Sequence, residues 1–129
     1  MADDDIPQQL RYTARHEWVR DDGEVITIGI TSFAQDELGD VVYVDLPPTG
    51  TQVRADEPFG EVESTKSVSD LYAPVTGEIV ERNEDLDDRP ELVNADPYGE
   101  GWMVRIRPAD RTELDALLDA DGYRAELGG

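Results

Sequence analysis

Short runs of alternating apolar and polar residues, separated by turn residues, recur along most of this chain. Alternation with a period of two is typical of β-strands that bury one face. The pattern predicts strands at residues 11–13, 16–19, 24–30, 41–46, 52–54, 58–63, 68–72, 78–81 and 101–106. The turn Asp21-Asp22-Gly23 joins the second and third strands into a hairpin. Strands this short, with turns this frequent, predict a sandwich or barrel of β-sheets.

Residues 31–39 predict a short internal helix. Thr31 and Ser32 belong to the residue types that cap helix N-termini, and Gly39 is of the type that most often ends a helix. The apolar side chains between these ends are Phe33, Ala34 and Leu38.

A second helix is predicted at residues 110–120. Asp110 or Thr112 can cap its start, and Glu113 can complete a capping box. The apolar positions at the helical spacing i, i+3 and i+4 are Leu114, Leu117 and Leu118. Residues 83–98 are rich in Asp, Asn and Pro, and they predict a polar loop.

The chain is expected to form one domain. Its 129 residues are typical of a single domain, and no linker divides them. Residues 1–10 are predicted to be a solvated acidic tail, and residues 11–129 the domain itself. No long apolar run and no signal peptide are present, which predicts a cytoplasmic protein without a membrane partner.

The net charge of −20 comes from 31 acidic residues against 11 basic ones. The acidic residues are spread over nearly every segment, so the excess covers the whole surface. Two interpretations stay open: a surface adapted to molar salt, where the Debye length falls to ~3 Å, or an ordinary acidic protein. We favour the first, which predicts a halophilic source. Nucleic acid is an unsuitable partner because phosphate binding needs a basic face.

The chain has no cysteine and one histidine, His16. This composition excludes disulfides and thiolate nucleophiles, argues against a metal site, and means that any thiol chemistry must be brought by a cofactor. No nucleophile signature accompanies His16, so we expect it to pack or to form a hydrogen bond at its strand.

The chain has one lysine, Lys66, and ten arginines. A surface charge is served equally well by arginine, whereas acylation needs an amine that can lose its proton. Lys66 lies in Glu63-Ser64-Thr65-Lys66-Ser67, between two predicted strands and beside small hydroxyl residues. The setting predicts a protruding lysine at a hairpin tip that a modifying enzyme can reach. An unmodified surface lysine in a turn remains the alternative.

A series of motifs runs in a fixed order along residues 11–127. They are Tyr12-Thr13, His16-Glu17-Trp18, Gly29-Ile30-Thr31, Leu38-Gly39-Asp40, Glu61 to Ser67 with Asp70, Ala73 to Ile79, Leu92-Val93-Asn94, Pro97-Tyr98 and Gly101-Trp102-Met103. The ordered set resembles the H-protein family of the glycine cleavage system. The resemblance implies a mainly β fold, the barrel-sandwich hybrid of lipoyl domains, with a short internal helix and a C-terminal helix.

The resemblance also implies a carrier without catalytic residues of its own. Lipoate would be joined to Lys66 by an amide, in a hairpin setting made by Glu63, Ser64, Thr65, Ser67 and Asp70. The absence of cysteine suits this chemistry, because no protein thiol can exchange with the dithiolane.

The partners implied by the resemblance are three enzymes and a modifying enzyme. A pyridoxal-phosphate glycine decarboxylase loads an aminomethyl group, an aminomethyltransferase passes the one-carbon unit to tetrahydrofolate, and a dihydrolipoyl dehydrogenase reoxidises the arm. A lipoate ligase or lipoyltransferase attaches the lipoate. The carrier is expected to be a monomer.

The loaded arm is expected to fold back onto the carrier surface. The positions that match the family's contacts to the aminomethyl amine are Glu17 and Asp70, whose carboxylates would form charge-assisted hydrogen bonds. Arg15 stands where the family often has a small hydroxyl residue, so the holding contacts differ in detail.

Three alternatives to the glycine carrier were weighed. A lipoyl or biotinyl carrier of another complex fits less well, because biotin sites place Met on both sides of the lysine, and Thr65 and Ser67 stand here. An H-like protein that relays lipoate to other acceptors keeps the fold and changes the task. An unmodified binding module would carry no lipoyl group.

Overall fold

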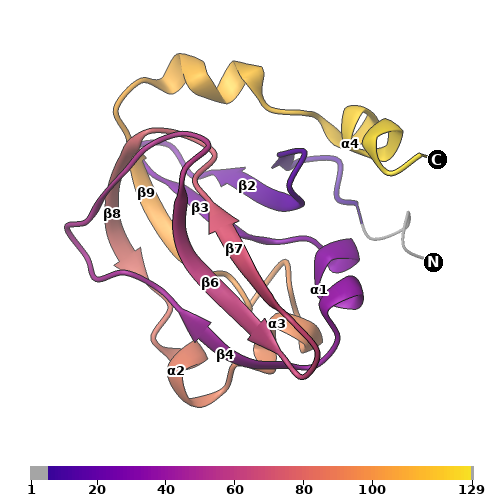
Figure 1. The fold of residues 1–129 in the computed structure, drawn as a ribbon. Coiled ribbons are helices and arrows are strands. Elements are labelled where there is room, and N and C mark those ends of the chain that lie inside the picture. The colour runs from indigo at the N-terminus through magenta and orange to yellow at the C-terminus, as the bar shows by residue number, and fades with distance from the viewer. Residues whose placement is uncertain (1–5, 129) are drawn as a thin grey trace.

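A computed structural model describes residues 6–128 of the chain. Nine strands form two antiparallel sheets (Figure 1). The larger sheet has the strand order β1-β2-β3-β9-β8-β5, and the smaller has the order β4-β6-β7. The larger sheet contains β1 (Arg11–Tyr12), β2 (Glu17–Asp21), β3 (Ile26–Ile30), β5 (Gln52–Val53), β8 (Gly77–Arg82) and β9 (Val104–Pro108). The smaller sheet contains β4 (Val41–Asp45), β6 (Pro58–Ser64) and β7 (Val68–Tyr72).

The two sheets share one apolar core. All five residues of β3 are buried, since neighbouring elements cover the strand on both faces. From the smaller sheet, Val44, Val62 and Leu71 join the same core cluster. Gly29 admits the Trp18 indole, because a Cβ at position 29 would lie 2.7 Å from the ring. The predicted mainly β sandwich and the hairpin of β2 and β3 are confirmed.

The alternation predicted for β4 is interrupted by a bulge. The pairing with β6 shifts between Val41 and Tyr43, so Val41 is buried and the next two residues are both exposed. A bulge adds one residue to one strand and reverses the side-chain alternation beyond it. Val42 is therefore exposed, whereas strict alternation over residues 41–46 would place it on the buried face with Val44.

Four short helices and a 3₁₀ helix complete the described chain. They are α1 (Ser32–Leu38), α2 (Asp85–Asp88), α3 (Leu92–Ala95), a 3₁₀ helix (Arg111–Ala116) and α4 (Ala120–Glu126). The internal helix is confirmed as α1: the Thr31 hydroxyl oxygen accepts the Ala34 N–H, and Gly39 ends the helix.

Two helix predictions need correction. Residues 83–98 are not a loop throughout, because α2 and α3 bury Leu86 and Val93. The segment 110–120 contains the 3₁₀ helix, and the C-terminal α-helix is α4, capped by the Asp119 side chain.

The chain before β1 is partly buried. Ile6 and Leu10 are buried and pack in a second apolar cluster with Tyr12 and Tyr123 of α4. The prediction of a solvated tail is therefore wrong for these two residues, and residues 1–5 lie outside the described chain. The boundary of the domain at residue 11 stays a prediction.

The described surface carries six ion pairs between arginine and carboxylate side chains. They leave most of the acidic side chains of residues 6–128 without an ion-pair partner. The halophilic interpretation stays a prediction, and it has a direct consequence for stability.

We expect the urea midpoint of unfolding to rise from low salt to 1 M KCl, because salt screens repulsion in the folded state. A midpoint that does not rise would contradict the salt-adapted interpretation.

Candidate functional site

Lys66 lies in the turn between β6 and β7, as the sequence predicts. Ser64 shapes this turn from within. Its backbone N–H donates to the Ser67 carbonyl at 2.8 Å, and its hydroxyl oxygen accepts the N–H groups of Lys66 and Ser67 at 3.2 and 3.1 Å. Ser64 is only 6% exposed, whereas Thr65, Lys66 and Ser67 are exposed. The hydroxyl beside the lysine therefore fixes the backbone and leaves the Lys66 side chain accessible.

The turn is also tied to the loop between α1 and β4. The Thr65 N–H donates to the Asp40 carbonyl at 3.0 Å. Gly39 has a φ of 84°, and a Cβ there would lie 3.4 Å from Cε of Lys66. The methylene stem of Lys66 therefore lies against a backbone that carries no side chain. This loop supports the lysine without enclosing its amine.

Asn94 of α3 holds that loop in place. Its Oδ1 accepts the Val41 N–H at 2.8 Å, and its Nδ2 donates to the Gly39 carbonyl and to Gln35 Oε1, both at 2.9 Å. Sequence reasoning assigns Asn94 no role beyond its place in a motif. The only signal for it is an asparagine next to apolar residues in a segment that the pattern predicts to be a loop.

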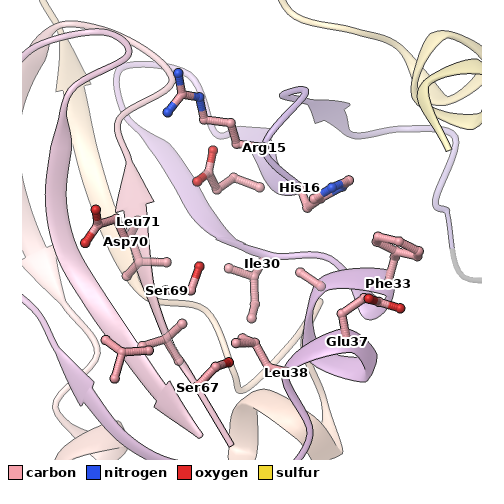
Figure 2. A pocket seen from close by; sticks show the side chains of 14 residues that line it. Arg15, His16, Ile30, Phe33, Glu37, Leu38, Ser67, Ser69, Asp70 and Leu71 are labelled. Carbon is pink, nitrogen blue, oxygen red and sulfur yellow. The ribbon is translucent and has the colours of Figure 1, made fainter.

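A pocket of about 380 Å³ lies beside the hairpin (Figure 2). Its walls come from the loop before β2, from β3, from α1 and from β6 and β7. The apolar lining is formed by Ile30, Phe33, Ala34, Leu38, Val62, Val68 and Leu71. The polar lining is formed by Arg15, His16, Glu17, Glu37, Ser67, Ser69 and Asp70. Ser67 therefore links the pocket to the neighbouring Lys66.

Glu17 is the buried carboxylate of the pocket and is 2% exposed. Its Oε1 accepts the Thr13 hydroxyl at 2.7 Å, and its Oε2 accepts the Tyr72 N–H at 3.1 Å. Burial raises the pKa of Glu17 from 4.5 to about 7, against the opposing effects of these two hydrogen bonds and of the Arg15 charge. Because Tyr72 ends β7 and Glu17 begins β2, the carboxylate also joins the two sheets.

Asp70 lies at the rim of the same pocket. It pairs with Glu61 of β6, which pairs with Asp45 of β4, and all three are exposed on the outer face of the smaller sheet. Ser69 precedes it on the opposite face, as successive strand residues do. Figure 2 shows the Asp70 carboxylate directed away from Ser69. β7 is an edge strand, so Asp70 still borders the pocket beside the buried Glu17.

Arg15 closes one side of the pocket. Its guanidinium carbon lies 3.8 Å above the centre of the Tyr72 ring, a cation–π contact. Arg15, which stands where the resembled family often has a small hydroxyl residue, is thus held against β7.

His16 and α1 are joined to the C-terminal helix through one hydroxyl. The Tyr123 oxygen lies 2.9 Å from Nδ1 of His16 and 2.7 Å from Oγ1 of Thr31. Burial lowers the pKa of His16. His16 has a φ of 73°, a conformation that this contact helps to hold. The expected hydrogen-bonding role of His16 agrees with this geometry.

The described residues contain no cluster of His, Asp or Glu arranged to hold a metal ion. None of the described helices is long and apolar enough to cross a membrane. A rigid hairpin that presents one exposed lysine, next to a pocket with an apolar wall and a buried carboxylate, defines a swinging-arm carrier of the lipoyl type.

Comparison with known proteins gives the family. The model of the glycine cleavage H-protein family matches residues 10–128, and the chain belongs to this family. A glycine cleavage system H protein of Bacillus subtilis is 56% identical over 118 residues, which is 92% of this chain and 93% of that protein. One of Brevibacillus brevis is 57% identical over 121 residues, 94% of this chain and 96% of that protein.

A solved structure agrees with the fold. The crystal structure of a glycine cleavage system H protein from Mycobacterium marinum superposes with a TM-score of 0.86 at 42% identity, covering 96% of this chain and all of that one. The chain is thus a non-catalytic lipoyl carrier that shuttles intermediates of the glycine cleavage system. A carrier of another complex is excluded.

The raised pKa of Glu17 predicts a pH-dependent stability. The folded chain keeps this proton up to about pH 7, whereas an unperturbed glutamate loses it near 4.5. Stability therefore falls as pH rises through this window, by at most about 3 kcal/mol at 1.36 kcal/mol per pKa unit. Urea unfolding of the wild type and of Glu17→Gln at pH 5 and pH 8 measures the difference. Equal pH dependence in the two proteins would refute a buried, raised Glu17.

Replacing Asn94 is expected to loosen the support of Lys66. Asn94→Ala leaves the Val41 N–H and the Gly39 carbonyl without this partner, at a cost of about 1–3 kcal/mol in unfolding free energy. Amide exchange at Thr65 should accelerate because the loop that accepts its hydrogen bond is released. Gln35→Ala removes only one of the three hydrogen bonds and is the control, with a cost of about 1 kcal/mol or less. Unchanged Thr65 exchange in Asn94→Ala would show that the loop holds without it.

Proposed function

We propose that Lys66 is the residue that carries lipoate, in amide linkage to its Nζ. The observation that supports this most is that the Lys66 side chain is accessible while the backbone around it is held in place. The Lys66 side chain is exposed, while the turn around it is fixed by Ser64 and by the Asp40 carbonyl. Lys66 is also the sole lysine of the chain, so no other side chain offers this amine. Glu63, Thr65 and Ser67 are exposed around it and form the surface that a modifying enzyme meets.

The neighbouring residues fit a lipoyl arm. From the backbone of Lys66 the extended arm spans roughly 10–15 Å, judged from ordinary bond lengths. The pocket that begins at Ser67 offers an apolar wall for a hydrocarbon chain and a dithiolane ring. When bound, the lipoyl group supplies a dithiolane that accepts an aminomethyl group together with two electrons.

The chain's own task is to hold and protect this cargo. Glu17 is placed to accept a hydrogen bond from the protonated amine, with Asp70 adding negative charge at the rim. A cation in the pocket favours the ionised form of Glu17, whose pKa near 7 makes that ionisation easy at neutral pH. Arg15 stays stacked on Tyr72 and limits access of water on that side.

The partners follow from this chemistry. A glycine decarboxylase with pyridoxal phosphate loads the arm, an aminomethyltransferase with tetrahydrofolate unloads it, and a dihydrolipoyl dehydrogenase reoxidises it. A lipoate ligase or lipoyltransferase attaches the arm. Tethering raises the effective concentration of the intermediate at each enzyme. We further propose that the carrier acts in the cytoplasm and as a monomer.

Intact-mass analysis tests the attachment site. Wild-type protein incubated with a lipoate ligase, lipoate and ATP is expected to gain the mass of one lipoyl group, and Lys66→Arg is expected to gain none. Because arginine keeps the positive charge, this control separates loss of the amine from loss of charge. A wild-type protein that gains no mass, or a Lys66→Arg variant that does, overturns the assignment.

A second experiment separates the glycine carrier from a lipoate relay. The decarboxylase exchanges bicarbonate into glycine when it is given a glycine carrier, whereas a lipoate relay would not support this exchange.

A further inference from the structure

Three large apolar side chains are exposed in the described chain, and all three lie on the smaller sheet. They are Val42, Tyr43 and Val68, exposed by 48%, 53% and 58%. We call them the apolar patch. Exposed single hydrophobic residues need no explanation, whereas a group of them on one surface often marks an interaction site.

The strand register brings the patch next to Lys66. Tyr43 of β4 pairs with Glu63 of β6, and Glu63 pairs with Val68 of β7. Directly paired residues lie on the same face, so these three side chains form one row across the sheet. The bulge in β4 adds Val42 to the exposed surface. The row is the first outward-facing one after the turn that carries the lysine.

Carboxylates border the patch. Side chains of the next row point inward, and the following outer row consists of Asp45, Glu61 and Asp70. No ion pair joins these three to an arginine within residues 6–128. The surface beside Lys66 therefore has an apolar centre and an acidic margin, and it is complementary to a partner with an apolar face and a basic margin.

Reach distinguishes between possible occupants. The unmodified lysine extends only about 6 Å from its Cα, from ordinary bond lengths. An enzyme that acylates Nζ must therefore contact the residues next to the turn. Enzymes that act at the end of the roughly 10–15 Å lipoyl arm can dock farther away. A patch next to the turn therefore suits the enzyme that acylates the short, unmodified lysine.

We propose that the apolar patch is the docking surface of the enzyme that attaches lipoate, which presents an apolar face with a basic margin. This inference rests on the proposed modification of Lys66. In the step that docking serves, the Nζ lone pair attacks the carbonyl carbon of an activated lipoyl group. The N–C amide bond forms, the bond from that carbon to adenylate or thiolate breaks with its electron pair, and Nζ gives its proton to solvent.

The double variant Tyr43→Thr/Val68→Thr tests the proposal. Threonine is β-branched and suits a strand, and it removes most of the apolar surface. With purified lipoate ligase, lipoate and ATP, the KM for the unmodified carrier is expected to rise about tenfold or more, with kcat within about twofold. Tyr43→Phe keeps the ring and should restore most of the affinity. Gln52→Thr, an exposed strand position on the other sheet, is the matched control and should leave KM unchanged.

Other outcomes would overturn the proposal. An unchanged KM in the double variant shows that the ligase docks elsewhere. Normal lipoylation combined with lost glycine exchange in Tyr43→Thr, which leaves the pocket lining intact, measured on protein lipoylated beforehand, assigns the patch to the decarboxylase instead. Wild-type dimers in sedimentation that the double variant abolishes assign it to a second copy of this chain. In each case the wild type still gains the lipoyl mass, whereas failure of the proposed function removes that gain.

Discussion

The hydrogen bond from the Thr65 amide to the Asp40 carbonyl ties the lysine turn to the body of the protein. A carrier lysine has to leave its side chain free, so its position depends on backbone contacts alone. Ser64 supplies these from inside the turn, and the loop of Gly39 and Asp40 supplies them from outside. Asn94 in turn fixes that loop. The arm that we propose at Lys66 would thus start from a backbone held on both sides of the turn.

The same loop belongs to the end of α1, whose side chains Phe33 and Leu38 form one wall of the pocket. The start of α1 is held by Thr31, which shares the Tyr123 hydroxyl with His16. The C-terminal helix therefore contributes no residue to the pocket but positions two of its walls. This explains how a segment remote from Lys66 in sequence becomes part of the carrier's working structure.

Sequence reasoning reached the strands and Lys66 because their signals are local. Period-two alternation is visible within five residues, and a sole lysine between two such runs can be placed at a hairpin tip. The helices were harder to predict. A four-residue helix such as α3 is too short to show a helical period, so the sequence pattern around Asn94 predicts a loop. Gly122 inside α4 concealed that helix, while the leucine spacing favoured an α-helix where a 3₁₀ helix forms.

Glu17 could be placed as a candidate from the family resemblance, but its environment could not. Its burial depends on Thr13 before it and on Tyr72, 55 residues later. These contacts hold the two sheets together at the pocket and use one lone pair on each carboxylate oxygen, so each oxygen keeps capacity for another donor. The Glu17 carboxylate is fixed, buried and only partly ionised near pH 7. An incoming cation stabilises its ionised form, because the cation offsets the burial cost that raised the pKa.

Alternation along β7 separates the two surfaces that a carrier needs. Ser69 and Leu71 point to the inner side of the sheet, whereas Val68 and Asp70 point to its outer face in register with β6 and line only the edge of the pocket. An arm that rests in the pocket therefore leaves Tyr43 and Glu63 of the outer row open. A shift of one residue in the pairing of β7 would exchange these faces and bury the charge of Asp70. The register next to the Ser64 turn thus decides which side chains of β7 point toward the pocket side and which point to the outer face.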